Sequence, residues 1–290
     1  MLATLATAAA LALAPSGAKA PSMRPTAASA VDGSMAADGA WDRDALMRGY
    51  SNPAELEAHE VRCSALPSDL VGTYYRNGHA RFVGRDGKKV RHPFDADGMV
   101  CGVSLDGRSG TAVVRQRYVA TAGAVAERAA GKTIHPGQFG NPLPFWEGGA
   151  DFKNLANTNV LAHGGKLLAL WEGSRPTTLD PLSLATVGEW DIDGLLGSDG
   201  LLGSGPTDSF SAHPRDTPGG GFVNFAYFGN PAAGTTKIRF WDFAADSFAL
   251  RSPAQEHEVP GFGLYHDFMV TESWCIVTAA PATWGPGGTI

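Results

Sequence analysis

The sequence is poor in the features that mark disulfide-rich, nucleic-acid-binding or membrane-spanning proteins. It has three scattered cysteines in 290 residues and no C-x-x-C, which indicates isolated buried or free thiols rather than a zinc ribbon or a disulfide framework. The formal net charge is −6 without a long basic run, so the Lys/Arg surface that nucleic acid demands is absent. The apolar run Leu2–Ala14 is too short to span a bilayer as a helix.

Acidic residues are also absent from the first 31 positions, where only Lys19 and Arg24 are basic. The leading Leu/Ala run is followed by Ala18–Ala20, an A-x-A cleavage pattern, and then by a Ser/Thr/Ala/Pro-rich stretch over 21–30. A signal followed by a transit peptide predicts delivery to a plastid, with plain secretion as the alternative. The other alternative is that the segment has no targeting function and is a disordered Ala-rich tail. We assign residues 1–40 to this targeting segment and linker.

A sustained 3.6-residue apolar period is likewise missing, which argues against parallel βαβ units. The 37 glycines and 19 prolines favour many short strands joined by tight turns. The pattern predicts an all-β protein, either a sandwich or a propeller. Four hairpins are expected, Met99–Leu105 with Thr111–Val119, Val160–Ala162 with Lys166–Trp171, Phe222–Phe228 with Thr236–Phe243, and Tyr265–Thr271 with Ser273–Ala280.

The β region is expected to begin at residue 66 and to continue to residue 290. Residues 41–65 form a separate N-terminal arm in this prediction. Helical character is expected within the arm at 45–47 and 54–58, where Ala, Leu and Glu predominate.

Two histidine signatures, Ser211–Pro214 and Tyr265–Phe268, each adjoin a strand-like run. Imidazoles at strand ends can form half of a metal site, although a lone histidine more often only makes hydrogen bonds. The His-Asp pair at 266–267 also fits metal-dependent phosphohydrolases. That motif needs a helix, whereas Phe268–Thr271 reads as a strand. His213 and His266 are therefore candidate ligands of an incomplete metal site.

Glu172 follows the apolar run Lys166–Trp171, which predicts a strand buried on both faces. A carboxylate at the end of such a strand needs a partner, because an unpaired buried charge is costly. A histidine ring N–H would serve. The alternative is an ordinary solvent-facing glutamate at a strand end.

The acidic segment Phe94–Met99 precedes another strand. Its aspartates are typical of a turn in which the side chains accept backbone N–H groups. A calcium loop is excluded, because the downstream glutamate and the flanking helices of an EF-hand are missing.

These segments, taken together and in this order, resemble the carotenoid cleavage dioxygenase family. The resemblance runs from about residue 66 to residue 280 and includes Phe94–Met99, the hairpin from Asn157 to Glu172, Ser211–Pro214 and His266–Phe268. Ala96 stands where the family usually has glycine, and His79–Arg81 replaces the usual Asn-Gly-Pro-Asn-Pro continuation. Both departures concern local turns.

The resemblance implies a seven-bladed β-propeller, of which this chain holds about the first half. It implies a ferrous ion held by four histidines, with His213 and His266 as the first two ligands. Glu172 would orient a ligand imidazole. The third and fourth ligands have no match in the chain, so the 290 residues alone are expected to bind Fe²⁺ weakly and not to turn over. No catalytic residue beyond the metal ligands is expected.

The implied reaction is oxidative cleavage of a conjugated double bond in a carotenoid or apocarotenoid by O₂, giving carbonyl products. The alternatives are an inactive apocarotenoid-binding or partner-binding relic of the same fold and an isomerase-type relative. A hydrophobic entrance with peripheral membrane contact is expected at Phe139 and at the segment Leu143–Trp146, with a loop packed on the propeller as the alternative.

Overall fold

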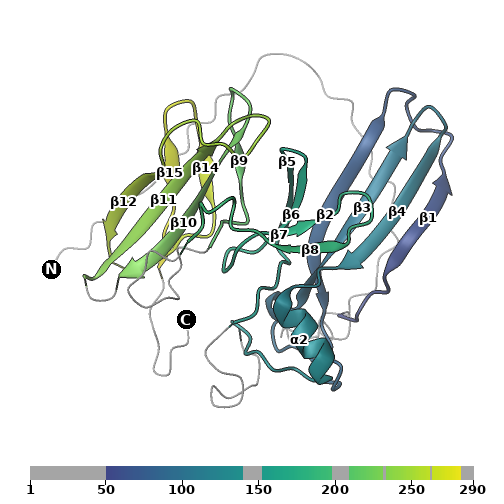
Figure 1. Cartoon of the computed structure of the whole chain (residues 1–290), viewed down its shortest axis with the longest axis horizontal. Coiled ribbons are helices and arrows are strands. Elements are labelled where there is room, and N and C mark those ends of the chain that lie inside the picture. The colour runs from purple at the N-terminus through teal and green to yellow at the C-terminus, as the bar shows by residue number, and fades with distance from the viewer. Residues whose placement is uncertain (1–49, 140–151, 198–208, 231–232, 262, 282–290) are drawn as a thin grey trace, which may run out of the picture. The chain divides into compact units, whose positions relative to one another are not determined.

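The computed structural model describes residues 50–139, 152–197, 209–230, 233–261 and 263–281. The targeting segment expected at 1–40 lies outside these ranges and remains a prediction. Figure 1 shows the described residues as a series of antiparallel sheets with a single α-helix among them, α2 (Ala122–Ala130). The all-β prediction is confirmed.

Three four-stranded antiparallel sheets follow one another along the chain. The second and third have their strands in sequential order, as in a propeller blade, whereas in the first β1 pairs with β4 and so lies at the edge opposite β2. Two further strand pairs come after the third sheet, and within the described ranges the sheets do not close into a ring. This arrangement confirms a partial propeller. The first sheet contains β1 (Leu56–Arg62), β4 (Thr111–Tyr118), β3 (Asp97–Asp106) and β2 (Val71–Arg81); the second contains β5 (Asn159–His163), β6 (Lys166–Leu170), β7 (Thr177–Leu179) and β8 (Thr186–Glu189); the third contains β12 (Gln255–Pro260), β11 (Thr235–Phe243), β10 (Phe222–Asn230) and β9 (Arg215–Asp216); the pairs are β13 (Gly263–Leu264) with β16 (Ala280–Pro281) and β14 (Phe268–Val270) with β15 (Cys275–Val277).

Strand β6 shows how neighbouring sheets share the core. Its side chains alternate between faces. Leu167 and Ala169 join the apolar cluster with Val100 of the first sheet, and Leu168 and Leu170 join the cluster with residues of the third sheet. The four side chains are at most 1% exposed. The prediction of a strand buried on both faces is confirmed, because the second sheet has a sheet on either side.

Strand β10 repeats this arrangement one sheet later. Phe222 packs with Trp241 in the cluster shared with the second sheet. Phe225 points to the other face and packs with Phe268 of β14, with ring centroids 4.9 Å apart. The edge strands β2, β5, β9 and β14, called the inner strands below, touch in pairs. Strand β2 contacts β5, and β14 contacts β9. The inner strands β9 and β14 are therefore held side by side.

The structure differs from the helix predictions in two places. Helical character was expected at 54–58, but β1 begins at Leu56 and pairs with β4. The backbone of β4 offers hydrogen bonds that outweigh a weak local helix propensity. Helix α2 was not expected, although Thr121 caps it by accepting the N–H of Ala124 and Gly131 ends it in a left-handed conformation (φ 66°).

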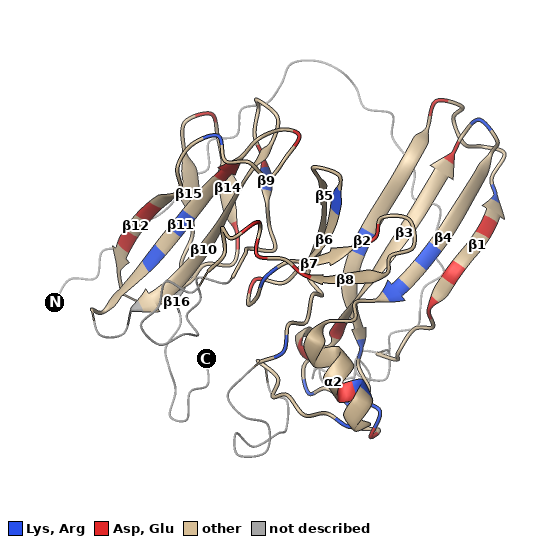
Figure 2. Ribbon diagram, viewed as in Figure 1, with Lys and Arg blue, Asp and Glu red and all other residues tan. Residues whose placement is uncertain are grey.

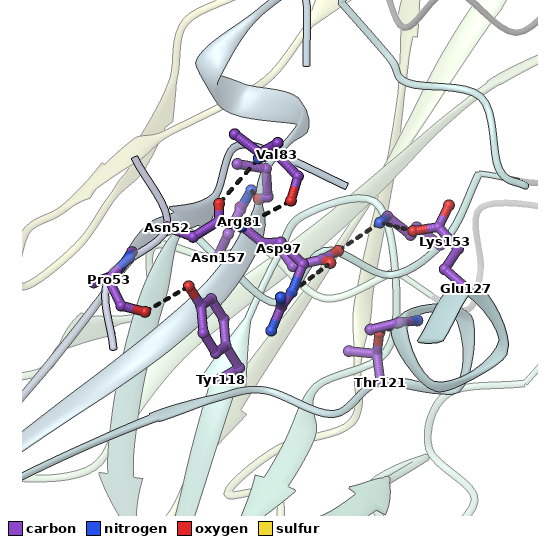
Figure 3. Close-up of polar contacts among 12 residues, drawn as sticks. Asn52, Pro53, Arg81, Val83, Asp97, Tyr118, Thr121, Glu127, Lys153 and Asn157 are labelled. Atoms are coloured by element: carbon purple, nitrogen blue, oxygen red, sulfur yellow. Dashed lines mark hydrogen bonds and ion pairs between the residues drawn. The ribbon is translucent and has the colours of Figure 1, made fainter. Parts of the chain in front are cut away.

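Helix α2 is tied to the first sheet through a buried charge cluster (Figure 3). Lys153 Nζ lies 2.7 Å from Asp97 of β3 and 2.6 Å from Glu127 of α2. Arg81 lies 3.8 Å from the same aspartate and covers the ring of Tyr118, also at 3.8 Å. The side chain of Lys153 is 9% exposed and that of Asp97 is 4% exposed. One cation thus bridges two carboxylates from different elements.

Figure 2 shows charged side chains on β1, β4 and β12, of which β1 and β12 are edge strands of their sheets. In the second sheet, β6 carries apolar residues at every position except Lys166. Cys63, Cys101 and Cys275 are free thiols, as the sequence predicted. Over the part of the chain that is described, no helix is both long and apolar enough to cross a membrane.

Candidate metal centre

His213 and His266 meet at the inner edge of the third sheet. His213 lies two residues before β9, and His266 lies two residues before β14. Their Nε2 atoms are 3.0 Å apart, and the ring planes are inclined by 68° with centroids 4.5 Å apart. The structure therefore brings together the two histidines that the sequence singled out, although they are 53 residues apart in the chain.

Glu172 completes the group. It lies two residues after the end of β6, and its Oε2 lies 2.5 Å from Nδ1 of His266. An ionised carboxylate only accepts hydrogen bonds, so the network assigns a proton to Nδ1. In the neutral ring the lone pair then lies on Nε2, the atom that faces His213. The partner expected for the glutamate at the end of β6 is His266.

Burial shifts the ionisation of two members of the group. Partial burial raises the pKa of Glu172, and the nearby His266 offsets only part of that shift. Burial, followed by the proximity of His266, lowers the pKa of His213. A lowered pKa favours the neutral imidazole, which is the form that binds metals. The surroundings of His213 therefore suit a ligand rather than a cation.

A salt bridge joins the two histidine segments. Arg215 NH2 pairs with the carboxylate of Asp267, and Arg215 Nε donates to the carbonyl of Phe268 at 3.0 Å. Burial acts to raise the pKa of Asp267, but hydrogen bonds from Arg215 and from the Phe268 N–H outweigh burial and lower it. The pair links the start of β9 to the start of β14. Sequence reasoning missed it, although Asp267 was part of the second signature.

Tyr227 of β10 is another member of this region that the sequence did not single out. Its ring packs on Tyr265, with centroids 5.3 Å apart. Burial, followed by the charge of Glu172, raises the pKa of Tyr227 to about 12. The phenol is therefore neutral at physiological pH and adds no second negative charge beside Glu172.

The converging nitrogens fit two neighbouring ligands of one metal ion. With metal–nitrogen bonds of about 2.1 Å, two ligands at right angles lie about 3.0 Å apart, and the Nε2 atoms are separated by 3.0 Å. A histidine that gives its other ring N–H to a carboxylate is the usual arrangement at metal sites. Among the described residues no cluster of three or more His, Cys, Asp or Glu side chains could hold a metal. The role of His213 and His266 as ligands therefore stays a prediction.

The other predicted motif, Phe94–Met99, has a supporting role in the structure. Asp95 accepts the backbone N–H groups of Gln138 at 2.7 Å and Phe139 at 3.1 Å. Gly98 passes so close to Ala156 that an added Cβ would lie 2.0 Å from its carbonyl oxygen. The motif thus organises the loop up to Phe139. The segment Leu143–Trp146 of the expected entrance lies outside the described residues.

Comparisons with known proteins agree with these features. The model of the retinal pigment epithelial membrane protein family matches residues 50–289. Apocarotenoid-15,15'-oxygenase from Synechocystis is 36% identical over 241 residues, which are 79% of this chain and 46% of the relative. Lignostilbene-alpha,beta-dioxygenase isozyme III from Sphingomonas paucimobilis is 33% identical over 242 residues, which are 82% of this chain and 46% of the relative.

The solved structures give the same result. The cobalt-substituted apocarotenoid oxygenase of Synechocystis matches with a TM-score of 0.70 and 33% identity, over 80% of this chain and 48% of that chain. The chain thus spans about half the length of the relatives that it matches.

Proposed function

The chain belongs to the carotenoid oxygenase family, and from that premise we propose that it supplies the first two metal-binding histidines of a non-haem iron(II) dioxygenase. The proposed substrate is a carotenoid or apocarotenoid. One conjugated double bond is cleaved, and the two oxygen atoms of O₂ become the oxygens of two carbonyl products. The relatives support this chemistry because their names describe oxygenases, and two of them act on apocarotenoids or lignostilbenes.

The observation that carries the proposal is the convergence of His213, His266 and Glu172. Glu172 holds the proton of His266 on Nδ1 and so presents the Nε2 lone pair toward His213. Burial lowers the pKa of His213 and so favours its neutral form. When bound, ferrous iron supplies the O₂ chemistry, which amino-acid side chains do not provide. The protein's part is to hold the two imidazoles in place and to keep Nδ1 of His266 protonated.

The proposal is tested with the protein from the complete coding sequence, supplied with Fe²⁺, an apocarotenal and ¹⁸O₂. We expect two carbonyl products that carry ¹⁸O. Replacing His266 by Ala should lower their rate of formation at least about 100-fold, because one ligand and the contact with Glu172 are lost together.

His257→Ala is the matched control, since His257 is exposed on β12 in the third sheet. This variant should retain the activity. Cleavage at the wild-type rate in the His266 variant would refute the ligand role. Binding of the apocarotenal without cleavage would support the inactive relic. Preferred cleavage of a stilbene would show that the substrate is a stilbene and not a carotenoid.

Peripheral membrane contact is part of the same proposal. Phe94 and Phe139 are each 50% exposed and lie edge to face with centroids 5.5 Å apart. Exposed phenylalanine side chains can insert at the boundary between the headgroups and the acyl chains of a bilayer. We expect the Phe145→Ser, Trp146→Ser double variant to float less with liposomes than the wild type. Equal flotation of the two proteins would exclude the entrance segment as a membrane contact.

A further inference from the structure

The peptide segment before His213 is held by asparagine side chains from two different sheets. We propose that Asn159 of β5, together with Asn224 of β10, positions the imidazole of His213 against that of His266. The inference rests on the proposed function in that it assigns His213 as a ligand. It adds two residues that act through the backbone of the ligand segment.

Two successive carbonyls before the histidine are bound in this way. Asn159 Nδ2 donates to the carbonyl of Ala212 at 2.8 Å, and Asn224 Nδ2 donates to the carbonyl of Ser211 at 2.9 Å. Ser211 is 4% exposed, and Ala212 and Asn224 are fully buried. Leaving a buried carbonyl without a partner destabilises the fold. Both bonds therefore hold the segment in one orientation.

Each asparagine uses both ends of its amide. Asn159 Oδ1 accepts the N–H of Val160 at 2.8 Å, and Asn224 Oδ1 accepts the N–H of Phe225 at 2.9 Å. A rotated amide would place its NH₂ group against these donors. The hydrogen bond from the next strand N–H to Oδ1 therefore fixes the amide in the orientation that lets Nδ2 donate to the carbonyl.

Two backbone N–H groups of the segment are also bound. The N–H of Ser211 donates to the carbonyl of Phe225 at 2.9 Å. The N–H of His213 donates to the Ser211 hydroxyl oxygen at 3.1 Å. With the two asparagine bonds, these contacts leave the backbone at 211–213 little freedom. With the backbone held, the position of the His213 ring depends only on the torsion angles of its own side chain.

Asn77 of β2 extends the arrangement to the first sheet. Its Nδ2 donates to the carbonyls of Ala156 and Asn159, each at 2.8 Å, while its Oδ1 accepts the N–H of Gly78. The inner strand of the first sheet thus holds Asn159, and Asn159 holds the peptide before His213. Three successive inner segments are joined by the same side-chain type in the same geometry.

Asn157 provides the matched control. It is 1% exposed and donates to two backbone carbonyls, those of Phe94 at 3.0 Å and Ala96 at 2.8 Å. These acceptors belong to the acidic motif and not to the segment at 211–213. Removing this amide therefore deletes equivalent hydrogen bonds two residues away from Asn159 and leaves both bonds to the His213 segment in place.

The experiment measures the distance between the two rings without metal. In protein with ¹³C-labelled histidine, the Cε1 protons of His213 and His266 should show a cross-relaxation peak, because the Nε2 atoms beside them are 3.0 Å apart. We expect Asn159→Ala to reduce this peak at least about threefold. Asn157→Ala should retain it. Asn159→Asp keeps the shape and the acceptor of Asn159, removes the donor to Ala212, and should behave like Asn159→Ala.

A peak of wild-type strength in either Asn159 variant would overturn the inference. So would an equal loss in Asn157→Ala, since the effect would then be general loosening. A Co²⁺ titration separates this result from the proposed function. If wild type shows the ring contact but binds no Co²⁺, the metal assignment fails while the positioning role stands.

Discussion

Replacing Glu172 by Gln is expected to lower the Co²⁺ affinity of the protein from the complete coding sequence by about 10- to 100-fold. The carboxylate lies 2.5 Å from His266 Nδ1, and its charge makes the imidazole a stronger donor to a metal through Nε2. A neutral amide keeps the shape and one acceptor oxygen but removes that charge. Isothermal titration calorimetry measures the change directly.

Glu189→Gln serves as the control for this result. Glu189 also accepts a side-chain hydrogen bond, from Asn154 Nδ2 at 3.0 Å, but it lies on β8. Its replacement should leave the Co²⁺ affinity unchanged. If Glu172→Gln folds like the wild type and binds Co²⁺ equally well, then the glutamate does not support the metal through His266.

Replacing Lys153 by Met is expected to lower the free energy of unfolding by about 3–5 kcal/mol, since breaking a buried ion pair leaves uncompensated charge. Lys153 is the cation between Asp97 and Glu127 (Figure 3). Methionine fills a similar volume but leaves the two carboxylates facing each other. Urea denaturation followed by tryptophan fluorescence measures the loss. Lys88→Met is the control, because Lys88 pairs with Asp86 at 3.7 Å and is 57% exposed. It should change stability by less than about 1 kcal/mol.

The loss in Lys153→Met should depend on pH in a defined direction. Burial raises the pKa of Asp97 in the folded protein, and Lys153 offsets part of that shift. Without the lysine the folded-state pKa rises further, while the unfolded value stays the same. The ionised carboxylate then destabilises the fold above its folded-state pKa, and protonation relieves this as the pH falls. The deficit relative to wild type should therefore be larger at pH 8 than at pH 5. An equal deficit at both values would exclude Asp97 as its origin.

Local patterns predicted most of the strands, because a strand's alternation and its turn residues lie within a few positions of one another. The hairpin of β3 and β4 and that of β10 and β11 fall where the sequence placed them. The pattern failed at β1 and α2. Strand β1 is exposed along its whole length, so it carries no buried face for a pattern to report. Helix α2 is only nine residues long, which is too short for a sustained period.

The sequence by itself determined the all-β class, the family resemblance and the identity of His213, His266 and Glu172 as candidates, because residue types and motif order are properties of the chain. Only the tertiary structure decided that Glu172 meets His266 across 94 positions and that Asn159 holds the peptide before His213 across 53. These contacts arise where inner strands of successive sheets pack together. No local period encodes such packing, since each strand's pattern records that a face is buried but not which residues bury it.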